Sequence, residues 1–419
     1  MLNDIRNLIF SKTAKDSLVI FWGNGVSAIL AIIITIIVAR TLGPEGWGIA
    51  AAVLGFITIL SALADLGFGS GLFRFASKNF HLGKTMKAEK ILTIVFLLRM
   101  VTALSLSFAL IIFSSFVTNF FFKNQDEALS LLGALGLLGG LLVDFQIAVF
   151  QARQSFKIAA IFITLTNCIR LILILLLFNF DQLNLFNLLL VYFSSSIFTF
   201  LISLLWQPVN LRWGNDWKDI LKDILSFSGW MGINRVFSVI SSRVDILILL
   251  QLTTPVEAGI FAAAKQLSSG IPIILGSFAT VLAPRFASLE GYKLKDFFKK
   301  TVLLSGIIGI GIMVGVLLAE PVISLLGPKY SGSTNVLRLL LISLVPFALS
   351  TPPVNFLIYS LNKPKIIALL SLVQLPLIIL GNFYLIPRWG IIGPVIIYTL
   401  VNISTMFVTY FFSVRKLKV

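Results

Sequence analysis

Twelve long apolar runs dominate this sequence and constrain what it can fold into. A membrane-spanning helix needs roughly 20 mostly apolar residues, and each run is long enough to form one. Only 12% of the 419 residues are charged, against about 25% in a typical soluble domain. We therefore predict an all-α integral membrane protein with twelve transmembrane helices. The runs cover approximately residues 18–39, 48–69, 91–118, 128–150, 158–178, 184–206, 228–251, 256–282, 301–324, 335–360, 366–386 and 391–413.

The first run follows two lysines, Lys12 and Lys15, as the apolar core of a secretory signal would. Its 22 residues, 18–39, are too many for such a core, and no small-x-small cleavage motif follows it. We expect this run to be retained as a membrane span.

The basic residues predict how the chain is oriented. Of the 33 Lys and Arg residues, 23 lie at the two termini and in alternate loops, whereas about five lie on the opposite side of the membrane. Because cytoplasmic loops carry the excess of Lys and Arg, both termini are predicted to be cytoplasmic. In a soluble chain a net charge of +16 would suggest nucleic acid, but here topology explains it and no nucleic-acid partner is expected.

The sequence repeats itself with an offset of 211 residues. The string Arg-Phe-Ala-Ser at 74–77 recurs at 285–288, and Pro44 and Gly48 fall on Pro255 and Gly259. Identical strings at one offset, both opening a basic loop, argue against chance. Each repeat holds six runs, so both halves have the same topology.

Two parallel six-helix bundles, related by a pseudo-two-fold axis along the membrane normal, are expected from this repeat, as in several transporter folds. We place the N-terminal bundle at residues 1–206, a cytoplasmic linker at 207–224 and the C-terminal bundle at 225–419. The tryptophans and lysines of the linker fit an interfacial helix on the membrane surface. A plain linker fits them equally well.

Eight charged residues fall inside the predicted spans, where charge is expensive and usually faces a cavity or a partner. The alternative for each is a side chain that snorkels to a headgroup, which is favoured for Arg99 near the start of its span. Arg243 and Asp245 lie on different faces of one helix and are not expected to pair. The eight are Asp65, Arg99, Asp144, Arg170, Arg235, Arg243, Asp245 and Lys265.

Polar residues with helical spacing accompany these charges. Asn234 and Ser238 fall on one face of the seventh predicted span, and Asn24 lies near the equivalent face of the first. These stripes either line a central cavity or mark close helix packing through small residues. Five basic against three acidic groups favour an anionic substrate, because guanidinium groups bind phosphate well.

Known catalytic and cofactor motifs are missing from this sequence. Gly83-Lys84-Thr85 has the ending of a phosphate-binding loop, but Lys78 stands where that loop needs a glycine. One histidine, His81, and one cysteine, Cys168, leave little material for a zinc site or a catalytic triad. We expect no cofactor, no metal and no enzymatic activity.

Two segments resemble a known family. The sequences ARTLGPEGWGIAAAV (39–53) and ADLGFGSGLFRFAS (64–77) are similar to the N-terminal pattern of bacterial O-antigen (Wzx-type) polysaccharide flippases. These belong to the multidrug/oligosaccharidyl-lipid/polysaccharide (MOP) exporter superfamily. The second half agrees less specifically, with SRVDILILLQL (242–252), VEAGIFAAAKQL (256–267) and APRFASL (283–289).

The resemblance implies a MATE-like fold and a flippase for a polyprenyl-diphosphate-linked oligosaccharide in the bacterial cytoplasmic membrane. Such proteins work by alternating access and contact membrane lipid. The resemblance leaves open an association with polysaccharide assembly machinery. In this interpretation the headgroup contacts are Arg235, Arg243, Lys265, Arg170, Arg99, Asn24, Asn234 and Ser238, and the ion-coupling candidates are Asp65, Asp144 and Asp245.

Three alternatives remain open at this point. The first is a multidrug or organic-cation antiporter of the same fold, which the scarcity of acidic residues disfavours. The second is a membrane-embedded enzyme that processes polysaccharide, which would need a large external loop or an intramembrane histidine. The third is a pore or scaffold, which the internal repeat and the polar stripes disfavour.

Overall fold

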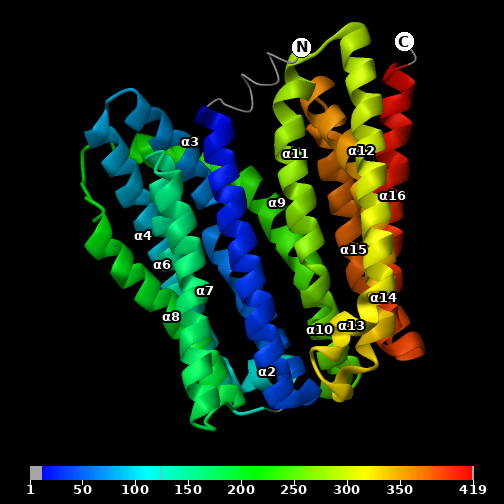
Figure 1. Ribbon diagram of the computed structural model, residues 1–419. Coiled ribbons are helices and arrows are strands. Elements are labelled where there is room, and N and C mark those ends of the chain that lie inside the picture. The colour runs from blue at the N-terminus through cyan, green and yellow to red at the C-terminus, as the bar shows by residue number, and fades with distance from the viewer. Residues whose placement is uncertain (1–11, 124, 418–419) are drawn as a thin grey trace. The chain divides into compact units, whose positions relative to one another are not determined.

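The computed structural model describes residues 12–123 and 125–417, and within these residues the only regular secondary structure is helical (Figure 1). Arg6 and Lys418, two of the predicted cytoplasmic charges, lie outside the described residues. The main helices are α2 (Lys12–Asp65), α3 (Phe68–His81), α4 (Thr85–Ile112), α5 (Ser114–Phe121), α6 (Ala128–Ala152), α7 (Phe156–Asn179), α8 (Leu185–Trp206), α9 (Trp217–Leu252), α10 (Pro255–Ser268), α11 (Gly270–Ser288), α12 (Gly291–Leu317), α13 (Ala319–Ser324), α14 (Ser333–Asn355), α15 (Pro364–Trp389) and α16 (Gly393–Leu417).

Each of the twelve predicted runs lies on helix. Among the described residues, nine helical stretches are long and apolar enough to cross a membrane. Two of them, Val19–Asp65 and Pro364–Lys416, each contain two predicted spans, which are separated at glycines with positive φ, Gly43 and Gly390. The predicted seventh span lies on α9, which carries three charged residues within that span and is not among the nine.

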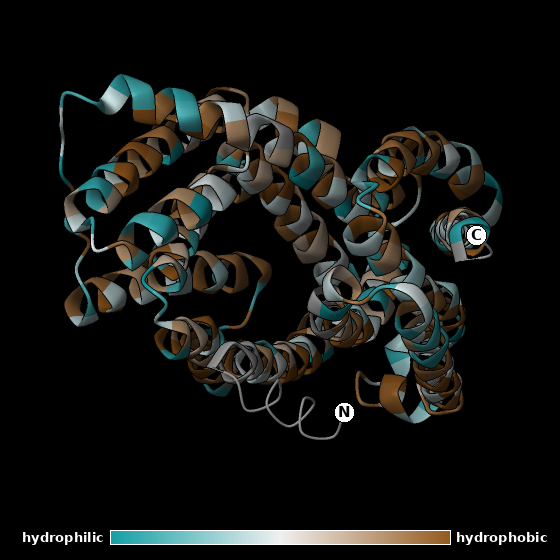
Figure 2. Cartoon of the chain, turned by 90° about the horizontal axis from the view of Figure 1, so that it is seen from above, coloured by the Kyte–Doolittle hydropathy of each residue, from teal (hydrophilic) through white to brown (hydrophobic). Residues whose placement is uncertain are grey.

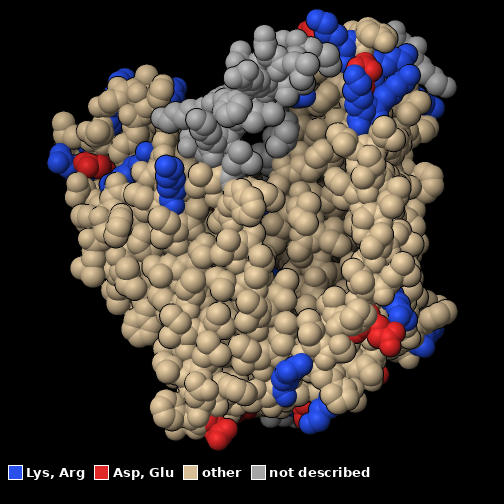
Figure 3. Space-filling view, in the orientation of Figure 1, with Lys and Arg blue, Asp and Glu red and all other residues tan. Residues whose placement is uncertain are grey.

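Charged side chains are scarce along the middle of these helices. Seen from above, the helices carry many hydrophobic turns, with hydrophilic ones among them (Figure 2). On the face drawn in Figure 3, the charged side chains gather toward the two ends and leave a broad uncharged band between them. Large exposed hydrophobic side chains such as Phe108, Leu205 and Leu317 cannot be explained by contact with water. The apolar solvent of a bilayer accounts for them.

The described chain forms two compact units. Unit 1 holds residues 53–239 together with the chain before Thr35, and unit 2 holds residues 35–52 and 240–419. The two units differ in two segments from the predicted bundles, which end at residue 206 and begin at residue 225. Residues 35–52 group with the second half of the chain, and residues 207–239 group with the first half.

Unit 1 is built around α6, which packs against α3, α4, α5, α7 and α8. Its glycines allow this crowding: a Cβ at Gly136 would overlap the ring of Phe193, and one at Gly139 would lie 2.8 Å from Ile197. Small residues on one helix let neighbouring backbones approach closely, which is how helices pack in a membrane. The helix α6 is therefore the central element of unit 1.

Unit 2 is built around α14, which packs against α10, α11, α12, α13 and α16. In the same unit, residues 35–52 pack against α10 at two repeat-related glycines. A Cβ at Gly48 would overlap the carbonyl oxygen of Pro255, and a Cβ at Gly259 would overlap that of Pro44. The two Pro-x-x-x-Gly segments thus contact each other reciprocally, which explains why the repeat keeps both residues and why residues 35–52 belong to unit 2.

The segment predicted as a linker is bound to unit 1 along its length. Arg212 pairs with Glu89 of α4 at 2.9 Å, Lys90 of α4 pairs with Asp216 at 2.7 Å, and Gln146 of α6 donates to the Gln207 carbonyl at 3.0 Å. The hydrogen bond from Lys90 also lowers the pKa of the Asp216 carboxyl. Residues 217–224 form the first turns of α9.

Candidate functional site

The second predicted span, residues 48–69, is broken near its end, between α2 and α3. Leu66 and Gly67 both have positive φ, 42° and 77°, so the helix unwinds there for two residues. A leucine in the left-handed region is strained, and such strain is commonly retained where function requires it. Interrupted membrane helices are also where transporters build binding sites, because the break exposes backbone polar groups.

Asp65 is the last residue before the break, and it organises the groups around it. Its carboxylate forms an ion pair with Arg99 of α4, and its Oδ2 lies 3.3 Å from Nη1 of Arg235 on α9. The Gly69 N–H donates to Asp65 Oδ1 at 3.2 Å, so the aspartate also caps the start of α3. Thr102 of α4 donates to the freed Ala64 carbonyl at 2.7 Å. Three helices thus converge on one carboxylate.

Arg99 does not extend to a headgroup as the snorkelling alternative expects. It is 2% exposed and faces Asp65, with which it forms an ion pair. Its guanidinium lies so close to Gly69 that a Cβ at that position would overlap it. Its Nε and Nη1 atoms are buried and make no hydrogen bond within the described residues, and neither does the Oγ of Ser228 on α9. Unpaired donors in a buried site leave hydrogen-bonding capacity for a further group.

Asp144 is the exposed acidic residue of this group. It lies on the central helix α6, within electrostatic range of Arg99, Arg235 and Asp65. It is exposed, and none of the ion pairs among the described residues includes it. Nine residues separate it from the exposed Leu135, which places the two about 180° apart around the helix. Leu135 fits a lipid-facing surface, so Asp144 lies on a different side of α6.

Arg170 on α7 forms a separate polar site in unit 1. Its guanidinium stacks 4.1 Å from the ring centroid of Tyr192 on α8 and donates to Asn167 Oδ1 at 2.9 Å. Asn167 in turn donates to Ser27 Oγ on α2 at 2.5 Å. None of the ion pairs within the described residues neutralises Arg170, and its Nε is buried without a partner. It is therefore a cation with free hydrogen-bonding capacity.

In unit 2 the intramembrane charges gather between α9 and α10. Lys265 pairs with Asp245, and its Nζ also donates to the Ser242 carbonyl at 2.7 Å. Arg243 is exposed and forms no ion pair with a described residue, although Asp245 lies within its electrostatic range. Arg243 and Asp245, two residues apart on α9, thus form no ion pair with each other in the described structure. Tyr398 of α16 lies in electrostatic range of Asp245 and completes the cluster.

The uncharged predicted contacts lie in unit 1. Asn234 and Ser238 are exposed on α9, on either side of the exposed Arg235, and Asn24 is half-buried on α2. Asn234, Arg235 and Ser238 form a polar exposed stretch in a helix that would otherwise face lipid. Their assignment as substrate contacts stays a prediction.

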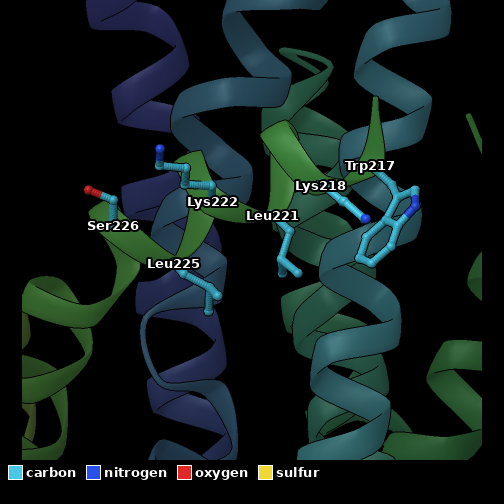
Figure 4. A pocket seen from close by; sticks show the side chains of 6 residues that line it. All are labelled: Trp217, Lys218, Leu221, Lys222, Leu225 and Ser226. Atoms are coloured by element: carbon cyan, nitrogen blue, oxygen red, sulfur yellow. The ribbon is translucent and has the colours of Figure 1, made fainter. Parts of the chain in front are cut away.

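A shallow recess lies at the beginning of α9, away from these charges. Figure 4 shows Leu221 and Leu225 projecting to one side of the helix and Lys222 to the other. Basic and aromatic residues beside leucines are typical of a segment at the membrane surface. Because a single stretch of one helix supplies all of its lining, the recess lacks the converging polar groups of a ligand site. Its lining residues are Trp217, Lys218, Leu221, Lys222, Leu225 and Ser226.

Several residues of these sites were not identified from the sequence. Tyr192, Asn167 and Ser228 act through contacts with helices distant in the chain, and a lone polar residue in an apolar run does not indicate its partner. The helix break had a signal, the glycine-rich string at 67–71 within an apolar run, because isolated glycines there mark close backbone approach.

Comparison with known proteins identifies the family. Residues 13–290 match the family model described as polysaccharide biosynthesis protein, which is about two thirds of the chain. The chain belongs to this family. The resemblance to a bacterial polysaccharide family is thereby confirmed.

Two curated bacterial relatives cover much of the chain. A Shigella flexneri protein named as an O-antigen transporter is 24% identical over 403 residues, which cover 91% of this chain and 93% of that protein. The capsular polysaccharide biosynthesis protein CapF of Staphylococcus aureus is 24% identical over 277 residues, 64% of this chain and 69% of the relative.

Solved structures share the fold. An inward-facing MATE-family multidrug transporter of the MOP superfamily matches with a TM-score of 0.72 and 15% identity, covering 94% of each chain. The lipid II flippase MurJ, in an inward closed conformation, matches with a TM-score of 0.70 and 16% identity over 94% of this chain and 87% of that one. The all-α, MATE-like membrane fold is therefore confirmed, and the chain is a multi-pass membrane protein.

Proposed function

We propose that this protein is a flippase that moves a polyprenyl-diphosphate-linked oligosaccharide across the bacterial cytoplasmic membrane. It carries the headgroup from the cytoplasmic to the outer leaflet by alternating access, with both chain termini in the cytoplasm. The O-antigen and capsule relatives and the fold shared with MurJ support this substrate class. The excess of Lys and Arg on alternate loops supports the orientation.

The observation that carries the proposal is the surplus of cations within the spans. Five basic and three acidic groups leave two positive charges, which match a diphosphate bridge with one negative charge on each phosphate. Arg170 and Arg243 are the cations that no carboxylate pairs with in the described structure. Burying an unneutralised diphosphate is prohibitive, so Arg170 in unit 1 and Arg243 in unit 2 are each proposed, separately, as a contact for a phosphate group.

Transport of a fluorescent polyprenyl-diphosphate sugar by proteoliposomes tests this assignment. Arg170→Gln and Arg243→Gln should each slow transport about tenfold or more, the loss of a charge-assisted hydrogen bond. Lys329→Gln is the matched control, because Lys329 is an exposed cation outside the predicted spans. Folded arginine variants that transport at the control rate would refute the headgroup assignment.

Coupling to an ion gradient is part of the proposal, and Asp245 is its best-placed carrier. Asp65 is buried against two arginines, whereas Asp245 faces one lysine in a partly exposed pair. A proton arriving at Asp245 would release Lys265. In proteoliposomes, an imposed proton or sodium gradient should accelerate transport by the wild type but not by Asp245→Asn. Equal rates for the wild type with and without gradients contradict coupling.

A multidrug antiporter is the competing function, because the MATE neighbour has the same fold. An interior with surplus positive charge is poorly suited to organic cations. Expression in a drug-sensitive strain separates the two functions: resistance to cationic drugs, without rescue of a strain that lacks its polysaccharide flippase, would favour the antiporter.

A further inference from the structure

The charge cluster at the helix break in unit 1 contains both acidic and basic groups, whereas Arg170 and Arg243 are cations without a paired carboxylate in the described structure. It consists of two acidic groups, Asp65 and Asp144, and two basic groups, Arg99 and Arg235, so its net charge is zero. A diphosphate would gain little there, because two carboxylates stand within electrostatic range of the same arginines. The cluster is therefore unsuited to the part of the substrate that carries the negative charge.

The cluster offers both hydrogen-bond donors and hydrogen-bond acceptors, which one uncharged ligand could use together. Arg235 is 45% exposed at its side chain, and Asp144 is exposed, so a guanidinium and a carboxylate are both accessible. Behind them, Arg99 has two buried nitrogen atoms without a hydrogen-bond partner. Sugar hydroxyl groups both donate and accept, and charged partners strengthen such hydrogen bonds.

The exposure of Asp144 suggests that its partner is an external ligand and not another side chain of the protein. A carboxylate in the middle of a membrane helix is costly unless it faces a partner or a water-filled space. Asp144 lies on the side of α6 opposite the lipid-exposed Leu135 and forms none of the ion pairs in the described structure. Its neighbour Arg235 is held by Asp65 on one side and free on the other.

We infer that Asp144 and Arg235 form a sugar-recognition subsite, which hydrogen-bonds hydroxyl groups of the saccharide next to the diphosphate. Asp144 accepts from one hydroxyl and Arg235 donates to another, while Asp65 and Arg99 position Arg235. This inference rests on the proposed flippase function and deepens it, because it separates sugar recognition from diphosphate binding. The diphosphate is left to the surplus cations.

Equilibrium binding to two lipids tests the subsite without any ion gradient. The probes are undecaprenyl diphosphate and the same lipid carrying one N-acetylhexosamine, titrated into the purified protein in nanodiscs. Asp144→Asn should weaken binding of the sugar-bearing lipid about tenfold or more, the loss of a hydrogen bond to a charged group. Binding of the bare diphosphate lipid should be unchanged.

The matched control is Asp181→Asn, which removes a carboxylate from an exposed turn whose φ of 53° asparagine also tolerates. It should leave both affinities unchanged. If Asp144→Asn changes the affinity for both lipids equally, the subsite is refuted. If it changes neither affinity, the subsite is also refuted, and that is the outcome expected if Asp144 only carries protons. If the wild type binds neither lipid, the proposed function fails, and this inference fails with it.

Discussion

The two units hold their intramembrane charges in different ways. In unit 1 the Asp65–Arg99 pair is almost completely buried, with side chains 1% and 3% exposed, and Arg235 reinforces it. In unit 2 the Asp245–Lys265 pair is 11% and 26% exposed, and an exposed Arg243 lies nearby. A guanidinium locked at a helix break suits a structural anchor. A partly exposed ammonium suits a pair that opens and closes.

This difference is not inherited from the repeat. The positions 211 residues after Asp65, Arg99 and Asp144 hold Gly276, Ile310 and Asn355. Asn355 lies near the end of α14, the central helix of unit 2, and donates to the Thr351 carbonyl of its own helix at 2.8 Å. The scaffold is therefore repeated while these charges are not.

The largest effect should follow from removing the acid of the buried pair. Asp65→Asn leaves Arg99 buried without a carboxylate, and breaking one side of such a pair costs about 3–5 kcal/mol of unfolding free energy. The thermal unfolding midpoint of the purified protein, followed by tryptophan fluorescence, measures this. The double variant Asp65→Asn/Arg99→Gln should recover much of the loss, because the charge left without Asp65 is then only Arg235, which is 45% exposed. An unchanged midpoint for the single variant contradicts the anchor role.

The corresponding change in unit 2 should cost less. Asp245→Asn leaves Lys265 with the Ser242 carbonyl and partly exposed, so the expected loss is about 1 kcal/mol. The same unfolding assay compares the two variants directly. If Asp245→Asn destabilises as much as Asp65→Asn, burial does not distinguish the pairs, and the comparison between the units fails.

The sequence was sufficient to predict the fold, because the signals are long and local. Apolar runs of membrane length, the alternation of basic loops and the 211-residue repeat each extend over many residues, and the membrane requires helices there. The intramembrane charges could also be identified, since charge in an apolar run stands out.

Their partners could not be predicted. Asp65 pairs with residues 34 and 170 positions away, and only the packing of α4 and α9 around the helix break brings them together. For the same reason the position of Arg99 near a span start suggested a headgroup contact, whereas the structure buries it. The grouping of residues 35–52 with unit 2 depends on the Gly48–Gly259 contact, which no single segment reveals.

The smallest effect is expected for a third ion pair, which extends the comparison to exposed positions. Lys90 and Asp216 are 28% and 40% exposed at their side chains and tie the 207–216 segment to α4. The pKa of Asp216 is lowered in the folded state, chiefly by the hydrogen bond from Lys90, so the ion pair stabilises the fold above the unfolded aspartate pKa of about 3.9. This contribution is lost as the pH falls through the lower folded pKa. The wild type should therefore unfold at a slightly higher temperature than Asp216→Asn at neutral pH, and the difference should vanish in acid. A difference that stays constant with pH would show that the pair acts through packing rather than charge.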